Sequence, residues 1–125
     1  MKSLVTFTAR NNKRRASKGL SGPLPESIGF LTELLEFDVS DNSITGEIPT
    51  TLGQCTYLAT LFLQENKLSG DVPSELGNLE YMTAMNLKTN DLEGEVPQGL
   101  CDVEAEVQVD CSVTCTCCTN YDCEN

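Results

Sequence analysis

A period of 24 residues dominates this sequence of 125 residues and constrains its fold more than any other feature. The residues that recur in one register are Gly22, Gly46, Gly70 and Gly94, Pro25, Pro49, Pro73 and Pro97, Asn42, Asn66 and Asn90, and Leu20, Ile44, Leu68 and Leu92. A fixed period in the range of about 20–50 residues is typical of solenoids, in which each repeat forms one coil and buries its apolar face against its neighbours. The sequence therefore predicts a stack of short coils.

The second coil shows the order of residues within one repeat. It contains Leu58, Leu61, Leu63, Asn66 and Leu68, which fit the pattern L-x-x-L-x-L-x-x-N-x-L. This pattern resembles the leucine-rich-repeat family, and the inserted Gly46-Glu-Ile48-Pro49 and Leu52-Gly53 segments resemble its plant-type subclass. The resemblance covers residues 20–101. It implies an α/β solenoid, a right-handed superhelix with a short parallel β-sheet on its concave face and 3₁₀ or irregular structure on its convex side.

Elementary physical chemistry supports the same architecture. Inward and outward residues alternate in Phe37-x-Val39, Leu61-x-Leu63 and Met85-x-Leu87, which predicts one short strand per coil. Where the chain leaves each strand, an inward Asn amide can bond backbone groups of its own and the adjacent coil, so a ladder is expected at Asn42, Asn66 and Asn90. The recurring proline withdraws a donor and fixes φ, which disfavours regular α-helix on the convex side.

The N-terminal stretch, residues 1–19, is interpreted as a partial repeat with a basic insertion. Leu4, Phe7, Ala9 and Asn12 fit the strand template, but Leu20 follows six residues late. The first 20 residues hold six basic and no acidic side chains. The cluster from Lys13 to Arg15 could attract an anionic polysaccharide or lipid, or form a solvated loop. No secretory signal is recognisable, since Leu4–Phe7 is too short for one, and we expect the parent protein to be longer at its N-terminus.

Residues 102–125 are expected to form a cysteine-rich C-terminal cap. Residues 102–117 alternate strictly between apolar or Cys and polar side chains, which predicts a long strand. Adding the 24-residue period to Met85 and Leu87 places Val109 and Cys111 beside them, and Thr114 at the Asn position. The tail also resembles the cysteine-rich ends of leucine-rich-repeat and receptor-like proteins of diatoms and related stramenopiles, which implies a secreted or cell-surface origin.

The chain has seven cysteines. Cys55 aligns with Leu31 and Leu79 and is expected to be a buried apolar residue. The other six allow 15 pairings, and a small cap gains stability from cross-links, so we expect three disulfides. A zinc site is the alternative, although only one C-x₂-C spacing is present. The six cap cysteines are Cys101, Cys111, Cys115, Cys117, Cys118 and Cys123.

A solenoid of this kind usually binds its partners on the concave strand face. Outward positions form columns there: Thr6, Glu36, Thr60, Ala84 and Gln108, then Thr8, Asp38, Phe62, Asn86 and Asp110, then Arg10, Ser40, Gln64, Lys88 and Ser112. The candidate ligand contacts are Glu36, Asp38, Ser40, Thr60, Phe62, Gln64, Asn86 and Lys88. Phe62 is either a binding anchor or a scattered surface apolar residue. Tyr57 and Tyr81, one period apart, are expected to stack on the solenoid flank.

Several function classes have no support in the sequence. There is no histidine, and no Walker, dinucleotide-binding or nucleophile-elbow motif, so neither catalysis nor a metal or other cofactor is expected. The net charge of −11 argues against a nucleic-acid binder, and no apolar run is long enough to span a membrane. The prediction is an extracellular or cell-surface binding module for a protein, a peptide or a glycan. The alternatives are a surface or wall-associated scaffold and an inhibitor of a secreted hydrolase.

Overall fold

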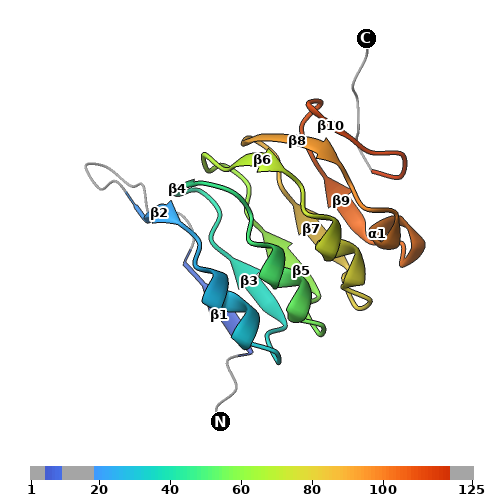
Figure 1. The fold of residues 1–125 in the computed structure, drawn as a ribbon, viewed down its shortest axis with the longest axis horizontal. Coiled ribbons are helices and arrows are strands. Elements are labelled where there is room, and N and C mark those ends of the chain that lie inside the picture. Colours follow the sequence, from blue (N-terminus) through green and yellow to red (C-terminus); the bar gives the residue numbers. More distant parts are fainter. Residues whose placement is uncertain (1–4, 10–18, 119–125) are drawn as a thin grey trace.

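The computed structural model describes residues 5–9 and 19–118 and confirms the predicted α/β solenoid. Its main sheet contains one three-residue strand from each coil, and every neighbouring pair is parallel. Figure 1 shows these strands side by side in chain order. They are β1 (Thr6–Thr8), β3 (Glu36–Asp38), β5 (Thr60–Phe62), β7 (Ala84–Asn86) and β9 (Glu106–Gln108).

A second row of short strands closes each coil on another side. There β2 pairs with β4, and β6, β8 and β10 form a three-stranded sheet. Gly46 has a φ of +80° next to β4, a conformation that L side chains rarely adopt, which explains why this position is glycine in every coil. The strands are β2 (Ser21–Pro23), β4 (Ser43–Thr45), β6 (Ser69–Asp71), β8 (Asp91–Glu95) and β10 (Val113–Thr114).

Each coil continues from the second row into a one-turn helix that begins directly after the recurring proline. The proline has an extended backbone, for example a ψ of 133° at Pro49, and the helix follows at once. Neighbouring helices pack closely, because a Cβ atom at Gly53 would lie 2.6 Å from the carbonyl oxygen of Glu75. The helices are the 3₁₀ helices η1 (Glu26–Phe30), η2 (Thr50–Gln54) and η3 (Ser74–Asn78) and the α-helix α1 (Gln98–Asp102).

The core is one continuous column of aliphatic side chains between the two rows of strands and the helices. Its largest fully buried members are Leu34, Leu52, Leu58, Leu61, Leu63, Leu68, Leu76, Leu79, Met82, Met85, Leu87 and Leu92. Burying one such side chain contributes about 1.5–3 kcal/mol to folding. The repeated leucines therefore hold each coil against the next.

The N-terminal edge of the solenoid leaves part of this column uncovered. Phe7 is 37% exposed although it occupies an inward position, and its ring stacks on the buried Phe37 with centroids 5.3 Å apart. Beside this pair lies an apolar hollow of about 410 Å³, whose lining includes Leu20, Pro25 and Ile28. The basic segment predicted to precede Leu20 lies outside the described residues.

The register expected for the C-terminal tail is wrong by two residues. Met85 pairs with Val107, not Val109. The path from Pro97 to Val107 is ten residues long, whereas the equivalent path from Pro73 to Met85 is twelve. The shortening coincides with α1, which replaces a 3₁₀ helix, and with a turn in which Glu104 has a φ of +59°.

The predicted long strand is also divided into β9 and β10. Cys111 is exposed and lies between them, although the alternation assigned it to the inward face. The last repeat is 22 residues long, so Ser112 occupies the position of the repeat asparagine. The 24-residue period predicted Thr114 at this position. Its hydroxyl donates a hydrogen bond of 2.7 Å to the carbonyl oxygen of Leu92, which joins the tail to the last full coil.

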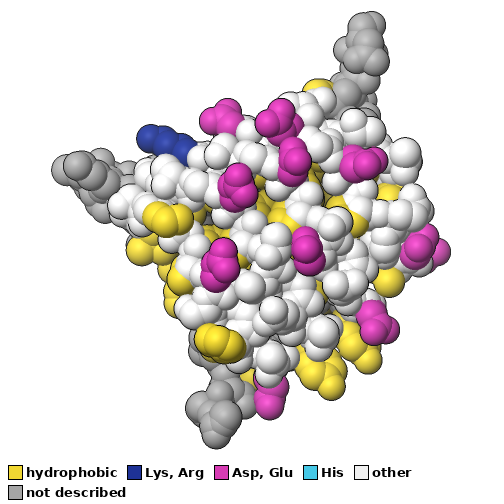
Figure 2. All heavy atoms as spheres, in the orientation of Figure 1, with side chains coloured by type: hydrophobic (Ala, Val, Ile, Leu, Met, Phe, Trp, Pro, Cys, Tyr) yellow, Lys and Arg dark blue, Asp and Glu magenta, His cyan; other side chains and the backbone are white. Residues whose placement is uncertain are grey.

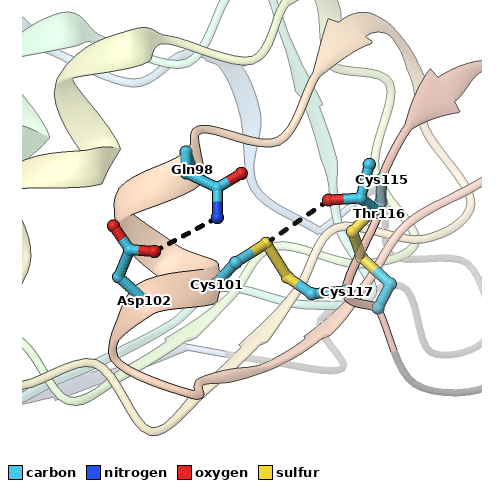
Figure 3. The surroundings of a disulfide bond; sticks show 7 residues. Gln98, Cys101, Asp102, Cys115, Thr116 and Cys117 are labelled. Carbon is cyan, nitrogen blue, oxygen red and sulfur yellow. Dashed lines mark hydrogen bonds between the residues drawn. A yellow bond between two sulfur atoms is a disulfide. The ribbon is translucent and has the colours of Figure 1, made fainter.

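Disulfides cross-link the cap. Cys101, in α1, pairs with Cys117, and Cys115 pairs with Cys118. Figure 3 shows the first of these bonds joining α1 to the tail beyond β10. Cys111 is also disulfide-bonded, and Cys123 lies outside the described residues. Every described cap cysteine is therefore in a disulfide, so none of them is a free thiolate that could bind zinc.

Candidate binding surface

The outward side chains of the five-stranded sheet form the surface that we call the sheet face. The hydrogen-bond register places Glu36, Thr60, Ala84 and Glu106 in its first column and Asp38, Phe62, Asn86 and Gln108 in its second. The two-residue shift places Glu106 of β9 in the first column and Gln108 in the second. The sequence period predicted Gln108 and Asp110 at these two positions. A third column, at the end of the strands, contains Ser40, Gln64 and Lys88, and the same shift puts Asp110 rather than Ser112 beside it. Arg10 lies outside the described residues.

Asp38 and Ser40 were expected to contact a ligand, but both side chains are buried, with 7% and 6% exposed. The Asp38 carboxylate accepts hydrogen bonds from the backbone N–H and the hydroxyl of Ser40, at 3.0 and 2.7 Å. Asn86 makes the same kind of bond, since its Oδ1 accepts the backbone N–H of Lys88 at 3.0 Å. These second-column side chains therefore cap the backbone two residues further on, a local turn that Asp and Asn favour.

Phe62 interrupts this capping scheme. It occupies the second column between Asp38 and Asn86, and its side chain has no acceptor for the N–H two residues later. Among the hydrogen bonds of the described residues, none involves the backbone N–H of Gln64. The side-chain Oε1 of Gln64 is buried and also has no partner there. The centre of the sheet face thus combines a partly exposed aromatic ring with unpaired polar groups.

A hollow of about 340 Å³ lies beside this ring. Its lining comprises Thr8, Glu36, Asp38, Thr60 and Phe62, from three neighbouring strands. Glu36 is exposed at its rim, and Thr60 and Phe62 are partly exposed. Among the described residues of this lining, none is basic. The hollow therefore offers an aromatic surface and a carboxylate to the solvent side of the sheet.

The three repeat asparagines lie behind the sheet face and hold adjacent coils together. The Asn66 amide donates to the carbonyl oxygens of Val39 and Leu63, at 3.0 and 3.1 Å, and its Oδ1 accepts the N–H of Ile44 at 3.0 Å. Asn42 and Asn90 make the equivalent bonds in their own coils. Next to the last of these asparagines, the Asp110 carboxylate accepts the backbone N–H groups of Thr89 and Asn90.

Other residues that the sequence singled out lie away from the sheet face. Tyr57 and Tyr81 stack with centroids 5.6 Å apart and are 52% and 57% exposed, on the loops that lead into β5 and β7. Cys55 is buried, and its thiol donates to the carbonyl oxygen of Ile28. Burial raises the pKa of the Cys55 thiol, which disfavours the reactive thiolate at neutral pH.

Acidic side chains are distributed over the side of the molecule shown in Figure 2, and exposed apolar side chains gather along its left and lower edges. Within the described part of the chain, no group of three or more His, Cys, Asp and Glu side chains could hold a metal ion. Among the same residues, no helix has the length and apolar character that a membrane-spanning segment needs.

Comparisons with known proteins agree with this architecture. The family model "Leucine Rich Repeat" matches residues 33–55 and 57–79. No curated protein matches the chain significantly.

Solved structures with the same fold include plant receptor ectodomains. The ectodomain of the Arabidopsis thaliana receptor kinase GASSHO1/SCHENGEN3, in complex with CASPARIAN STRIP INTEGRITY FACTOR 2, is 32% identical with a TM-score of 0.68, over 76% of this chain and 12% of that one. The plant peptide hormone receptor RGFR1, in complex with RGF2, is 33% identical with a TM-score of 0.66, over 76% and 16%.

A shorter relative gives the same result. The BIR2 ectodomain from Arabidopsis thaliana is 28% identical with a TM-score of 0.63, over 72% of this chain and 51% of that one. The chain therefore spans between 12% and 51% of the length of the protein chains in these three structures. The repeat register, the parallel sheet and these matches together show that the chain is a leucine-rich-repeat protein.

Proposed function

We propose that this chain is a non-catalytic binding module that recognises a protein or peptide ligand on its sheet face. The observation that carries the proposal is the partly exposed Phe62 beside a hollow, in the one second-column position between Asp38 and Asn86 that does not cap its own backbone. Buried aromatic anchors dominate the energetics of many protein interfaces. Two of the similar structures are described as complexes, and one of these contains a peptide hormone receptor.

We further propose that the module belongs to a secreted or receptor-like ectodomain. Disulfides persist in oxidising compartments and are rare in the cytosol, and the described cap contains two complete ones. The similar solved structures that are named as ectodomains support the same location. The ligand would then be an extracellular protein or peptide.

Selection from a displayed library of random peptides tests the function. Binders selected on the wild-type chain should lose at least about 30-fold in affinity on Phe62→Ala, because truncating a central anchor typically costs about 2 kcal/mol or more. Biolayer interferometry measures the change.

Phe30→Ala is the matched control, since this ring is 82% exposed in η1, away from the sheet face. Its affinities should equal those of the wild type. Equal binding of the selected peptides to Phe62→Ala and to the wild type would contradict a binding site on the sheet face. A selection without specific binders would favour the scaffold function.

A further inference from the structure

Three groups with different chemistry lie along one diagonal of the sheet face. Glu36 is in the first column on β3, Phe62 is in the second column on β5, and Lys88 is in the third column just after β7. Each step along this diagonal crosses one strand and advances two residues. Since strands lie about 4.8 Å apart and rise about 3.3 Å per residue, each step is about 8 Å.

The two ends of the diagonal have opposite charge and different surroundings. Glu36 is exposed at the rim of the hollow, where Phe62 also presents its ring, so a cationic side chain can meet both a carboxylate and an aromatic surface. At the other end, Lys88 is partly exposed. The acidic group on the next coil, Asp110, is engaged by backbone N–H groups.

Gln64 adds a hydrogen-bond donor to the Lys88 end of the diagonal. In the flanking coils the equivalent N–H groups, of Ser40 and Lys88, point to outward side chains of the second column, Asp38 and Asn86. By repeat equivalence the Gln64 N–H points to the same side, where Phe62 cannot accept it. An oxyanion placed there can accept from this N–H and pair with Lys88.

From this arrangement we propose that the ligand is an extended peptide segment with a cation, an apolar side chain and a carboxylate at alternate positions. It places the cation at Glu36, the apolar group on Phe62, and the carboxylate at the Gln64 N–H and Lys88. Alternate side chains of an extended peptide lie on one face about 7 Å apart, which matches the 8 Å step once the long charged side chains bend. This inference rests on the proposed function and specifies the ligand class of the same site.

Three blocked pentapeptides test the charge order against ¹⁵N-labelled protein by NMR titration. All have leucine at the centre and alanine beside it, and their ends are lysine and aspartate, two lysines, or two aspartates. The wild type should prefer the mixed peptide by about 3- to 10-fold in Kd, since each exposed charge pair contributes modestly. Glu36→Lys should prefer the peptide with two aspartates, and Lys88→Glu should prefer the peptide with two lysines.

The matched controls make the same charge changes elsewhere. Glu93→Lys and Lys67→Glu alter exposed side chains that are not on the sheet face, and both should keep the wild-type preference. The spectra report at the same time that each variant is folded.

Two outcomes would overturn the inference. Binding without any charge preference would reject the charge order and leave the proposed function intact. If no pentapeptide shifts the amide signals of β3, β5 and β7, the charge order also fails. The library selection then decides separately whether the sheet face binds peptides at all.

Discussion

At the scale of single residues, the repeat asparagines and the second-column side chains of Asp38 and Asn86 form hydrogen bonds with backbone groups. The Phe62 side chain cannot form such a bond. The inward position of Asn66 could be predicted because an asparagine that recurs after each strand can bond backbone groups of its own and the adjacent coil. The burial of Asp38 and Ser40 could not be predicted from alternation, which assigns both to the outward side. Their mutual hydrogen bonds fold the two side chains down against the backbone and away from solvent.

Asn66→Ala should lower the free energy of unfolding by about 3 kcal/mol. The substitution leaves the buried Ile44 N–H without its partner, which costs about 1–3 kcal/mol. It also removes one of the two asparagine hydrogen bonds to each of the Val39 and Leu63 carbonyl oxygens, which keep those from Asn42 and Asn90. Urea denaturation followed by circular dichroism measures the change.

Asn78→Ala is the control for this substitution, because the Asn78 side chain is exposed in η3. It should change the stability by no more than about 0.5 kcal/mol. If both variants lost the same free energy of unfolding, the hydrogen bonds of Asn66 would contribute no more to stability than an exposed asparagine does.

At the scale of elements, the full coils follow the sequence period and the C-terminal cap does not. The loop between α1 and β9, residues 103–105, is two residues shorter than the loop between η3 and β7, residues 79–83, so the last strand pairs two residues out of period. Strict alternation over residues 102–117 concealed this change, because a shift by two residues keeps every side chain on the same side of the sheet. Disulfide pairing was equally inaccessible, since six cysteines allow 15 connectivities.

The link between α1 and the tail should be the main cross-link of the cap. The Cys101–Cys117 bond closes a loop with a sequence separation of 16, and the chain-entropy model assigns such a loop about 3 kcal/mol. Replacing both cysteines by serine should lower the midpoint of urea unfolding accordingly.

Removing the Cys115–Cys118 bond provides the comparison. This bond closes a loop with a separation of only 3, so its chain-entropy effect should be clearly smaller. A larger loss of stability for the short loop than for the long one would contradict a role of the Cys101–Cys117 bond in tying α1 to the last strands.

At the scale of the whole molecule, a fold built from one repeated coil separates stability from recognition. Inward leucines and asparagines recur in every full coil and hold the stack together, whereas outward residues vary from one coil to the next. This division explains why the fold could be predicted from the 24-residue period and the ligand could not. The repeat does not constrain the outward positions, so their ligand preference depends on which side chains the sheet places next to one another.

Binding at the sheet face is tested by an amide chemical-shift map of the ¹⁵N-labelled chain with a peptide selected on the wild type. The largest shifts should lie within residues 60–64 and 84–88, around Phe62 and Lys88, with smaller shifts on β3. Largest shifts in η1–η3 or in the cap would contradict it, because the ligand would then bind outside the sheet face.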